Sequence, residues 1–216
     1  MSTLAILPVK RFELAKQRLS ARLPAAQRET VARAMVEDVL HTLTASSELT
    51  GVLVVTNEPA VAALAETLGA IVEADRTEAG QSAAAGVGIA YALQAGIERV
   101  LLIPGDCPAL DGEELAALLA HPGGGRVVVV VPDRHGTGTN ALLLNPPDAI
   151  APAFGPDSFA RHCELADEAG ARCETARPST LLLDIDTPED LAELLATASE
   201  RAPRTRAAFA ALTAER

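Results

Sequence analysis

Runs of apolar residues along the chain alternate with segments whose apolar positions recur every three or four residues. Continuous apolar runs are typical of strands buried on both faces, and the longer period is typical of helices packed on a sheet. The runs predict strands over residues 3–9, 51–56, 70–74, 100–106, 126–133, 139–145 and 181–186. The periodic segments predict helices over about residues 26–45, 59–69, 82–96, 157–170 and 189–198, with one more after residue 111.

Short polar residues stand where three of these helices are expected to begin. Asn57, Asp111 and Thr187 are predicted to be N-caps, and Pro59 and Pro188 fall in the first turns that follow two of them. Side-chain oxygens of such residues accept hydrogen bonds from free backbone amides, and proline is well tolerated in a first turn. These signals place the helix boundaries more firmly than the apolar period does.

The order of the predicted elements indicates the fold class. Repeated strand-helix-strand units with short links predict an α/β protein with three layers, a mostly parallel mixed sheet between two layers of helices. We predict a single domain over residues 1–216, in which the Arg- and Ala-rich residues from about 199 form a C-terminal extension. In such sheets ligands bind at the carboxyl ends of the strands, where the strand order reverses.

Composition narrows the classes of partner. Hydrophobic residues make up 49% of the 216 residues and aromatic residues only 2%, so base stacking along a nucleic acid strand is not expected. The formal net charge of −11 argues against binding to nucleic acid or to anionic membranes. No apolar run is long enough to span a membrane, and the three cysteines have no CxxC spacing. We expect a cytoplasmic protein with reduced thiols.

The loop after the first predicted strand carries an unusual set of cations. Lys10 and Lys16 are the only lysines of the chain, and Arg11 and Arg18 stand beside them. No Walker motif and no GxGxxG follows the strand, so side-chain cations would have to hold any nucleotide phosphates. A solvent-exposed basic turn is the alternative that this segment alone leaves open.

Three aspartates follow predicted strands. Asp106 ends one of them, and Asp184 and Asp186 alternate in the run "LLLDID", so that both would point to one side of a strand. Neighbouring carboxylates in an apolar run repel one another unless a cation lies between them, and hard oxygen ligands suit Mg²⁺. We therefore predict that Asp106, Asp184 and Asp186 bind Mg²⁺. For Asp186 alone, a role in capping the next helix is an alternative.

The run "DIDTP" also resembles the DxDxT nucleophile motif of haloacid-dehalogenase-type phosphatases. Pro188 stands where that motif has Thr or Val, the run lies near the end of the chain, and no lysine follows it. This reading is therefore disfavoured.

A fourth cluster combines "DRHGTGTN" with "FGPDSFARH". Glycines 136 and 138 would let this loop approach a ligand closely, and Thr137, Thr139, Ser158 and the amide of Gly155 could donate hydrogen bonds to a phosphate or carboxylate. The two histidines of the cluster, His135 and His162, lack an acidic partner placed by the sequence. A surface or helix-packing role is expected for both.

Together these motifs resemble the guanylyltransferase family that makes the deazaflavin coenzyme F-420. The resemblance covers most of residues 4–195 and rests on "PVKRFELAKQRL", "PGDCPAL", "DRHGTGTN", "FGPDSFARH" and "DIDTPEDL". It implies a Rossmann-like nucleotidyltransferase fold of the nucleotide-diphospho-sugar transferase type. It further implies transfer of GMP from GTP to phosphoenolpyruvate or 2-phospho-L-lactate, release of pyrophosphate, and passage of the product to a following transferase of the pathway.

The resemblance also assigns roles to residues. It implies Asp106, Asp184 and Asp186 as metal ligands, Thr139, Gly155 and Ser158 as contacts of the phosphorylated acid, and the lysine loop with Lys10, Arg11 and Lys16 as the triphosphate-binding segment. Lys16 would offset charge on the departing pyrophosphate. One segment departs from the pattern, since "GQSAAAG" stands where relatives typically carry Gly-Leu-Asn-Ala near the nucleotide base.

Several readings stay open at this stage. The acceptor could be phosphoenolpyruvate, 2-phospho-L-lactate or 3-phosphoglycerate, or in a related transferase a sugar phosphate or a molybdopterin. Gln81 and Ser82 leave the strictness for GTP open, and the oligomeric state is open as well. A non-catalytic nucleotide-binding module is the rival from another class. It predicts nucleotide binding without Mg²⁺ and no turnover.

Overall fold

The protein is described by a computed structural model in which residues 1–14, 19–20, 23–197 and 200–214 are placed. The strands are β1 (Thr3–Val9), β2 (Gly51–Thr56), β3 (Ile71–Glu73), β4 (Arg99–Leu102), β5 (Val127–Pro132), β6 (Thr139–Asn145) and β7 (Arg172–Thr175). The α-helices are α1 (Ala25–Ala45), α2 (Pro59–Thr67), α3 (Gln81–Gln94), α4 (Gly112–Leu119), α5 (Ser158–Glu168), α6 (Pro188–Ala196) and α7 (Pro203–Ala214). The described residues also include the short 3-10 helices η1 (Phe12–Leu14) and η3 (Ser179–Leu181).

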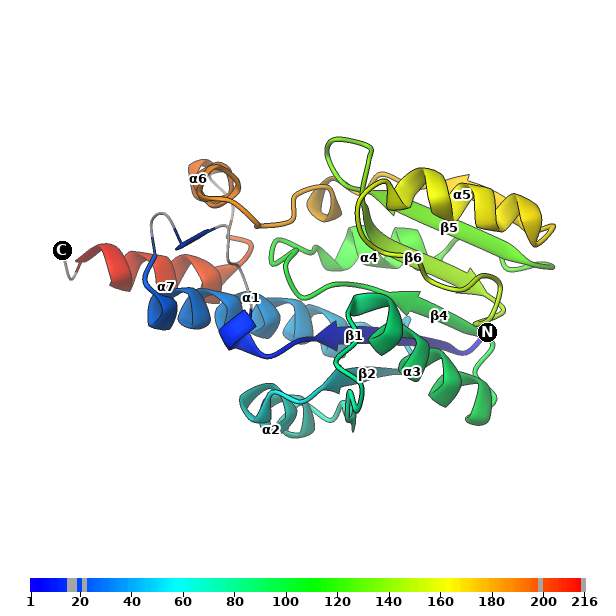
Figure 1. Ribbon diagram of the computed structural model, residues 1–216, viewed down its shortest axis with the longest axis horizontal. Coiled ribbons are helices and arrows are strands. Elements are labelled where there is room, and N and C mark those ends of the chain that lie inside the picture. Colours follow the sequence, from blue (N-terminus) through cyan, green and yellow to red (C-terminus); the bar gives the residue numbers. More distant parts are fainter. Residues whose placement is uncertain (15–18, 21–22, 198–199, 215–216) are drawn as a thin grey trace.

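The strands form one seven-stranded mixed sheet in the order β3-β2-β1-β4-β6-β5-β7 (Figure 1). Strand β6 pairs antiparallel with both β4 and β5, and the other pairings in the sheet are parallel. The chain first builds the sheet outward from β1 through β2 to β3, and then returns to place β4 on the other side of β1. The strand order therefore reverses between β1 and β4, which confirms the predicted α/β class and marks where a ligand site is expected.

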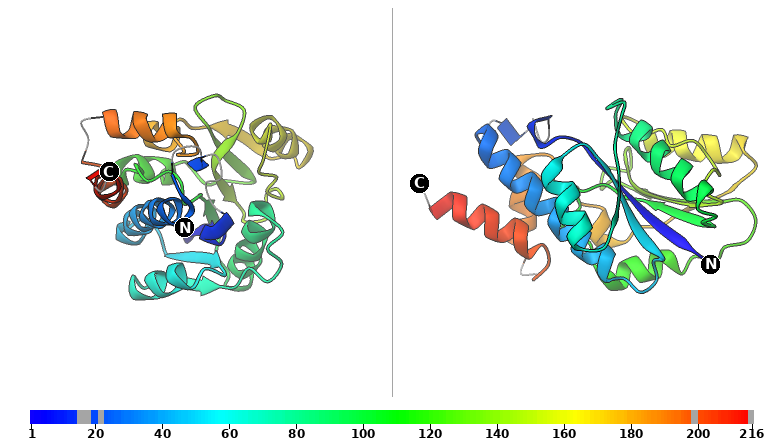
Figure 2. Two further views of the ribbon diagram at one scale, coloured as in Figure 1. Left: turned by 60° about the vertical axis from the view of Figure 1, so that its left-hand side comes forward. Right: turned by 90° about the horizontal axis from the view of Figure 1, so that it is seen from below.

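Helices cover both faces of the sheet, as the alternation of side chains along β1 requires (Figure 2). Ala5 and Leu7 belong to a core cluster shared with α1, α4 and α6, whereas Leu4 and Ile6 belong to a second cluster shared with α3 and α5. Burial of the strands on both faces explains why they appear in the sequence as continuous apolar runs.

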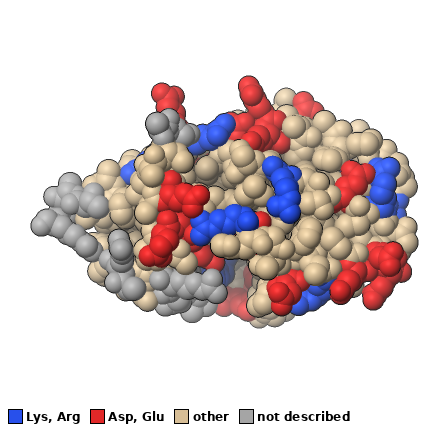
Figure 3. All heavy atoms as spheres, turned by 90° about the horizontal axis from the view of Figure 1, so that it is seen from above, with Lys and Arg blue, Asp and Glu red and all other residues tan. Residues whose placement is uncertain are grey.

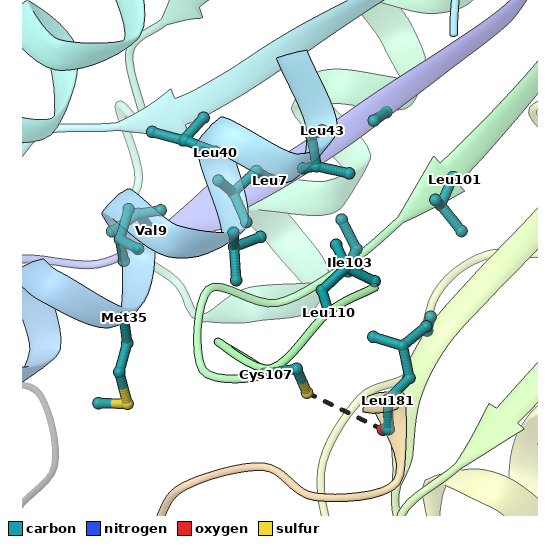
Figure 4. Close-up of a cluster of buried hydrophobic side chains, with 14 of the residues drawn as sticks. Leu7, Val9, Met35, Leu40, Leu43, Leu101, Ile103, Cys107, Leu110 and Leu181 are labelled. Carbon is teal, nitrogen blue, oxygen red and sulfur yellow. Dashed lines mark hydrogen bonds between the residues drawn. The ribbon is translucent and has the colours of Figure 1, made fainter. Parts of the chain in front are cut away.

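Part of the first cluster lies directly beneath the carboxyl ends of the strands (Figure 4). Side chains of α1, such as Met35 and Leu40, pack there with Leu7 of β1 and Ile103 after β4. The Cys107 thiol lies 3.9 Å from the carbonyl oxygen of Leu181. This contact joins the loop after β4, which carries Asp106, to the end of η3, just before Asp184 and Asp186.

The predicted strand over 181–186 is wrong. Residues 179–181 form η3, and residues 182–187 are irregular. Their backbone groups find partners outside a strand ladder: the carbonyl of Leu181 accepts from Asn140 Nδ2 at 2.7 Å, and the amide of Ile185 donates to the Asp106 carbonyl at 2.9 Å. The aspartates of this run are therefore not held by the pleat of a strand. The sequence also missed β7, a four-residue edge strand that is mostly exposed and polar.

Two of the three predicted N-caps are found in the structure, and one is not. Asp111 Oδ1 accepts from the amides of Glu113 and Glu114, and Thr187 forms a capping box with Asp190, so both predictions are confirmed. Asn57 is not the N-cap of α2. That position is Glu58, because the Asn57 side-chain amide donates instead to Glu78 and to a carbonyl after β3.

Residues near the C-terminus form α7, which lies alongside α1 (Figures 1 and 2). Its N-terminus is held by Asp38 of α1, a buried carboxylate that accepts from the amides of Arg204 and Thr205 and from the Thr205 hydroxyl. Phe209 and Leu212 pack against the first core cluster. These contacts give α7 a place on the domain that its weak apolar period did not indicate.

Candidate functional site

Two cavities lie along the carboxyl ends of the strands and meet at shared residues. One, of about 300 Å³, is lined by the ends of β1, β2 and β4, by α1 and by the N-terminus of α3. The other, of about 470 Å³, is lined by residues 133–135, 137–140 and 154–158 and by Asp184, Asp186, Thr187 and Asp190. Gln81, Pro104 and Asp106 line both cavities. The aspartate after β4 thus lies at the junction of two binding volumes. We refer to these as the first-strand cavity and the aspartate cavity.

The first-strand cavity holds the described part of the lysine loop. Lys10 and Arg11 follow β1 directly and are exposed, while Lys16 and Arg18 fall outside the described residues. Lys10 makes no hydrogen bond or ion pair within the described part of the chain. Arg11 Nε instead lies 3.1 Å from Glu78 Oε1. The two described cations of this loop therefore differ: Arg11 is paired with a carboxylate, and Lys10 is not paired with any described side chain.

Glu78 organises the rim of the first-strand cavity. Its Oε1 accepts from Asn57 Nδ2 at 2.8 Å and from Arg11, and these two hydrogen bonds hold the pKa of Glu78 below its ordinary value. Its amide in turn donates to Asp75 Oδ1. The loop after β3 is thereby tied to the ends of β1 and β2. Nothing in the spacing of the sequence indicated this connection.

The predicted metal-binding aspartates line the aspartate cavity. The Ile185 amide, which donates to the Asp106 carbonyl, brings the run "DID" beside the loop after β4. Burial raises the pKa of Asp184, and the negative charges of Asp106 and Asp186 raise it further. Asn140 Nδ2, 3.3 Å from Asp184 Oδ1, opposes part of this effect. The structure therefore brings the three carboxylates close enough for the charges of two of them to raise the pKa of the third.

The donors present fit a hard divalent cation, since they are carboxylate oxygens whose mutual repulsion a cation would relieve. Within the described residues no group of three or more His, Cys, Asp or Glu side chains is close enough to hold a metal ion jointly. A cation here would thus bind one or two of the carboxylates and complete its shell with water or phosphate oxygens, as Mg²⁺ commonly does. The alternative that Asp186 caps the next helix is wrong, because Thr187 is the N-cap of α6 and forms a capping box with Asp190.

The predicted acceptor contacts, Thr139, Gly155 and Ser158, all line the aspartate cavity. Ser158 begins α5 and is almost completely buried, and its amide donates to the Gly155 carbonyl at 3.2 Å. Gly155 has φ near 127°, in the region that side chains rarely adopt. These residues share the volume that the aspartates face, as the order of elements predicted.

Asp133 shapes the loop that precedes Thr139, and the sequence analysis overlooked it. Its Oδ1 accepts from the Thr137 amide at 2.9 Å. Burial alone would raise the pKa of Asp133, but the backbone amides of Thr137, Gly138 and Gly136 hold it below its ordinary value. A Cβ on Gly138 would lie 2.8 Å from Asp133 Oδ2. A side chain on Gly138 would thus crowd the Asp133 carboxylate, and Gly138 also lines the aspartate cavity.

The histidines of this region have different surroundings. His135 is exposed at the tip of the loop, where Arg134 Nε donates to its Nε2. His162 has no exposed surface, which excludes the surface role and agrees with the helix-packing alternative. Its ring lies between Thr139 and the backbone of Ala153. Only His162 can therefore influence the aspartate cavity through a fixed set of hydrogen bonds.

Arg134, which lines the aspartate cavity, is paired with carboxylates of α6. Arg134 forms ion pairs with Asp190 of the capping box and with Glu193 of α6. The face that carries α5 and α6 accordingly shows acidic and basic side chains interspersed (Figure 3). Arg134 thereby fastens the loop before β6 to the helix that follows the aspartates.

Asn140 is a further residue of the site that sequence analysis missed. It is buried, and its amide bridges the Leu181 carbonyl and Asp184. The sequence feature that could have indicated Asn140 is its position as a polar residue at the start of an otherwise apolar strand. A buried side-chain amide at such a position must find hydrogen-bond partners.

None of the described helices is long and apolar enough to cross a membrane. Two solved structures share the fold. One, from Desulfovibrio desulfuricans G20 and described as a nucleotide-diphospho-sugar transferase, superposes with a TM-score of 0.77 at 19% identity, covering 99% of this chain and 96% of its own. A 4-diphosphocytidyl-2C-methyl-D-erythritol synthase has a TM-score of 0.62 at 14% identity, covering 89% of this chain and 97% of its own. These matches confirm the nucleotide-diphospho-sugar transferase type of fold.

Sequence comparison reaches closer relatives. A phosphoenolpyruvate guanylyltransferase of Conexibacter woesei is 49% identical over 210 residues, which are 95% of this chain and 94% of that protein. One of Sphaerobacter thermophilus is 40% identical over 195 residues, covering 90% of this chain and 93% of that protein. The family model described as "Guanylyl transferase CofC like" matches residues 3–206. The resemblance seen in the motifs is thereby confirmed, and the chain belongs to the CofC-like guanylyl transferase family.

Proposed function

We propose that this protein transfers GMP from GTP to the phosphate of phosphoenolpyruvate, or of a closely related phosphorylated acid, and releases pyrophosphate in coenzyme F-420 biosynthesis. The observation that carries the proposal is the pair of cavities that meet at Asp106. A nucleotide in the first-strand cavity and a small acid in the aspartate cavity would bring their phosphates together at that junction. The names of the similar proteins agree with this assignment.

The chemistry asks little of the protein in proton transfer. A phosphate oxygen of the acceptor is already anionic at neutral pH, so it can attack the α-phosphorus without a general base. A P–O bond forms there as the bond to the oxygen that bridges the α- and β-phosphorus atoms breaks. That oxygen takes the electron pair and leaves with pyrophosphate. The site residues have to align the two phosphates and to offset their charge.

Charge is offset from both cavities. Lys10 lies at the end of β1 on the nucleotide side, and Lys16 and Arg11 are proposed to act with it on the triphosphate. One or two of the carboxylates of Asp106, Asp184 and Asp186 would hold Mg²⁺. When bound, the ion would neutralise phosphate charge and align the reacting oxygens. Thr139, Ser158 and the Gly155 amide would orient the acid. The product would then pass to a following transferase.

A panel of nucleotides and acceptors tests the proposal. Purified protein with Mg²⁺ is given each nucleoside triphosphate with phosphoenolpyruvate, 2-phospho-L-lactate, 3-phosphoglycerate or a sugar phosphate, and pyrophosphate release and product mass are recorded. We expect turnover with GTP and a phosphorylated three-carbon acid, with the product mass of their GMP adduct. Nucleotide binding without turnover on any acceptor would contradict the proposal and favour a binding module.

A further inference from the structure

His162 is a buried imidazole that the chemistry above does not use. It lies on α5 one turn after Ser158 and has no exposed surface. Its Nδ1 lies 2.9 Å from Thr139 Oγ1, and its Nε2 lies 2.9 Å from the backbone nitrogen of Ala153. Both ring nitrogens therefore have partners, one in the proposed acceptor site and one in the loop that leads to Gly155.

The partner on one side determines the tautomer. A backbone N–H can only donate, so Nε2 must accept from Ala153 and carries no proton. Burial and the positive charge of Arg161 lower the pKa of His162 to about 4, so the ring is neutral near pH 7. A neutral imidazole has one proton, which must then be on Nδ1. His162 therefore donates a hydrogen bond to Thr139 Oγ1.

This assignment leaves the Thr139 hydroxyl free to donate its proton. Its oxygen already accepts from His162, and within the described residues its proton has no protein acceptor. Thr139 lines the aspartate cavity, so the proton is available to a ligand bound there. We propose that His162 is a positioning residue that presents the Thr139 hydroxyl as a donor to an anionic oxygen of the phosphorylated acid. The inference rests on the proposed function for the identity of that acid.

The same ring also holds the opposite wall of the cavity. The Ala153 amide is anchored on Nε2, and the Phe154 ring meets the imidazole edge-on with centroids 5.3 Å apart. The Phe154 amide donates to Ser82 Oγ at 2.9 Å. His162 thus fixes both the donor on β6 and the backbone that precedes Gly155. A buried ring with two directional bonds is suited to this because it loses little freedom when the acid binds.

Two substitutions separate the two bonds. In His162→Gln the side-chain oxygen can reach the place of Nε2 and keep the Ala153 bond, but no donor remains near Thr139. In His162→Asn the amide nitrogen can take the place of Nδ1 and keep donation to Thr139, while the Ala153 bond is lost. Because one hydrogen bond that orients a ligand group is worth about tenfold in affinity, we expect His162→Gln to raise the acceptor KM roughly tenfold. The KM for GTP should stay within about twofold, and His162→Asn should recover much of the loss.

A double-mutant cycle shows whether His162 acts through Thr139. We expect Thr139→Val with His162→Gln to raise the acceptor KM no further than Thr139→Val alone, since the threonine hydroxyl is the shared element. His41→Gln, a histidine change outside both cavities, is the matched control and should leave both KM values unchanged. Independent, additive effects of the two changes would overturn the inference. So would equal rises for GTP and acceptor.

The tautomer itself can be read without any assay of activity. In uniformly ¹⁵N-labelled protein, long-range ¹H–¹⁵N spectra between pH 6 and 8 report which imidazole nitrogen carries the proton, and His162→Gln assigns the signal. We expect a neutral ring with the proton on Nδ1 throughout. A proton on Nε2, or a charged ring, would overturn the inference whether or not the enzyme is active. If GTP and the acids show no turnover while this tautomer is found, the proposed function fails and the hydrogen-bond assignment stands.

Discussion

The first-strand cavity and the aspartate cavity, the two sides of one cleft, present different kinds of functional group. On the first-strand side the functional groups are exposed cations such as Lys10 and Arg11, which follow the end of β1. On the aspartate side, Thr139 and Ser158 are buried, and Thr139 is fixed by His162. A flexible cation can follow a triphosphate whose charge moves during reaction, whereas a small acid is selected by donors that are already in place. We infer that charge holds the nucleotide and preorganised geometry selects the acceptor.

The largest effect is expected among the aspartates beside the junction of the two cavities. Asp184→Asn should remove nearly all activity, by roughly a thousandfold, because a carboxylate proposed to hold the cation that offsets phosphate charge is lost. It should also abolish most of the rise in Tm that Mg²⁺ with GTP produces, since a ligand that binds only the folded state stabilises it by mass action. Thermal shifts and initial rates for parent and variant measure both effects. An undiminished shift with retained activity would remove Asp184 from the metal site.

The same variant carries a prediction on stability and pH. The pKa of Asp184 is raised in the folded state, so its ionised form disfavours folding at neutral pH, and this penalty fades as pH falls through that raised pKa. The metal-free variant should therefore be as stable as the parent or more so at neutral pH, with the gap closing as the pH falls through the raised pKa of Asp184. Urea unfolding at several pH values is the measurement. A variant less stable than the parent at every pH would count against this account.

Lys16 tests the nucleotide side, although it lies outside the described residues. If it offsets charge on the departing pyrophosphate, Lys16→Met should leave the fold intact and lower kcat by roughly a hundredfold. Circular dichroism checks the fold and pyrophosphate release the rate. Near-normal turnover in the folded variant would remove Lys16 from the mechanism.

The acceptor side should respond in KM rather than in kcat. Thr139→Val and Ser158→Ala each remove one hydroxyl donor from the aspartate cavity, so each should raise the acceptor KM roughly tenfold, with a smaller change in the KM for GTP. Steady-state kinetics with each substrate varied in turn gives both constants. Equal rises for the two substrates would argue against a separate acceptor pocket.

The smallest effect is expected at the rim. Glu78→Gln removes the charge that holds Arg11 but keeps an acceptor for Asn57. Both partners are exposed, so we expect no measurable change in Tm and a change in the KM for GTP below about threefold. A rise in the KM for GTP as large as the rise in acceptor KM expected for Thr139→Val would mean that this rim is preorganised like the acceptor site.

Much of the site was predictable because parallel strands end at one edge of the sheet. Asp106 was assigned to the site from its position after a predicted strand, and Thr139 and Ser158 from the motifs "DRHGTGTN" and "FGPDSFARH". All three line one cavity. Asp184 was placed there for a wrong local reason, since its segment is irregular rather than a strand.

The rest depends on hydrogen bonds between distant parts of the chain. Asn140 reaches Asp184 across 44 positions, and His162 reaches Thr139 across 23. A pattern of local periods carries no information on such pairs. It also gave no sign of α7, whose place depends on the buried Asp38 more than on an apolar stripe.

The division of the cleft is tested most directly by crossing one variant from each side with both substrates. KM for GTP and for the phosphorylated acid are determined in Lys10→Met and in Thr139→Val. The account predicts opposite patterns: Lys10→Met raises the KM for GTP several-fold and leaves that for the acid nearly unchanged, and Thr139→Val does the reverse. If each variant raised both constants by the same factor, the two cavities would not bind separate substrates, and the account would be contradicted.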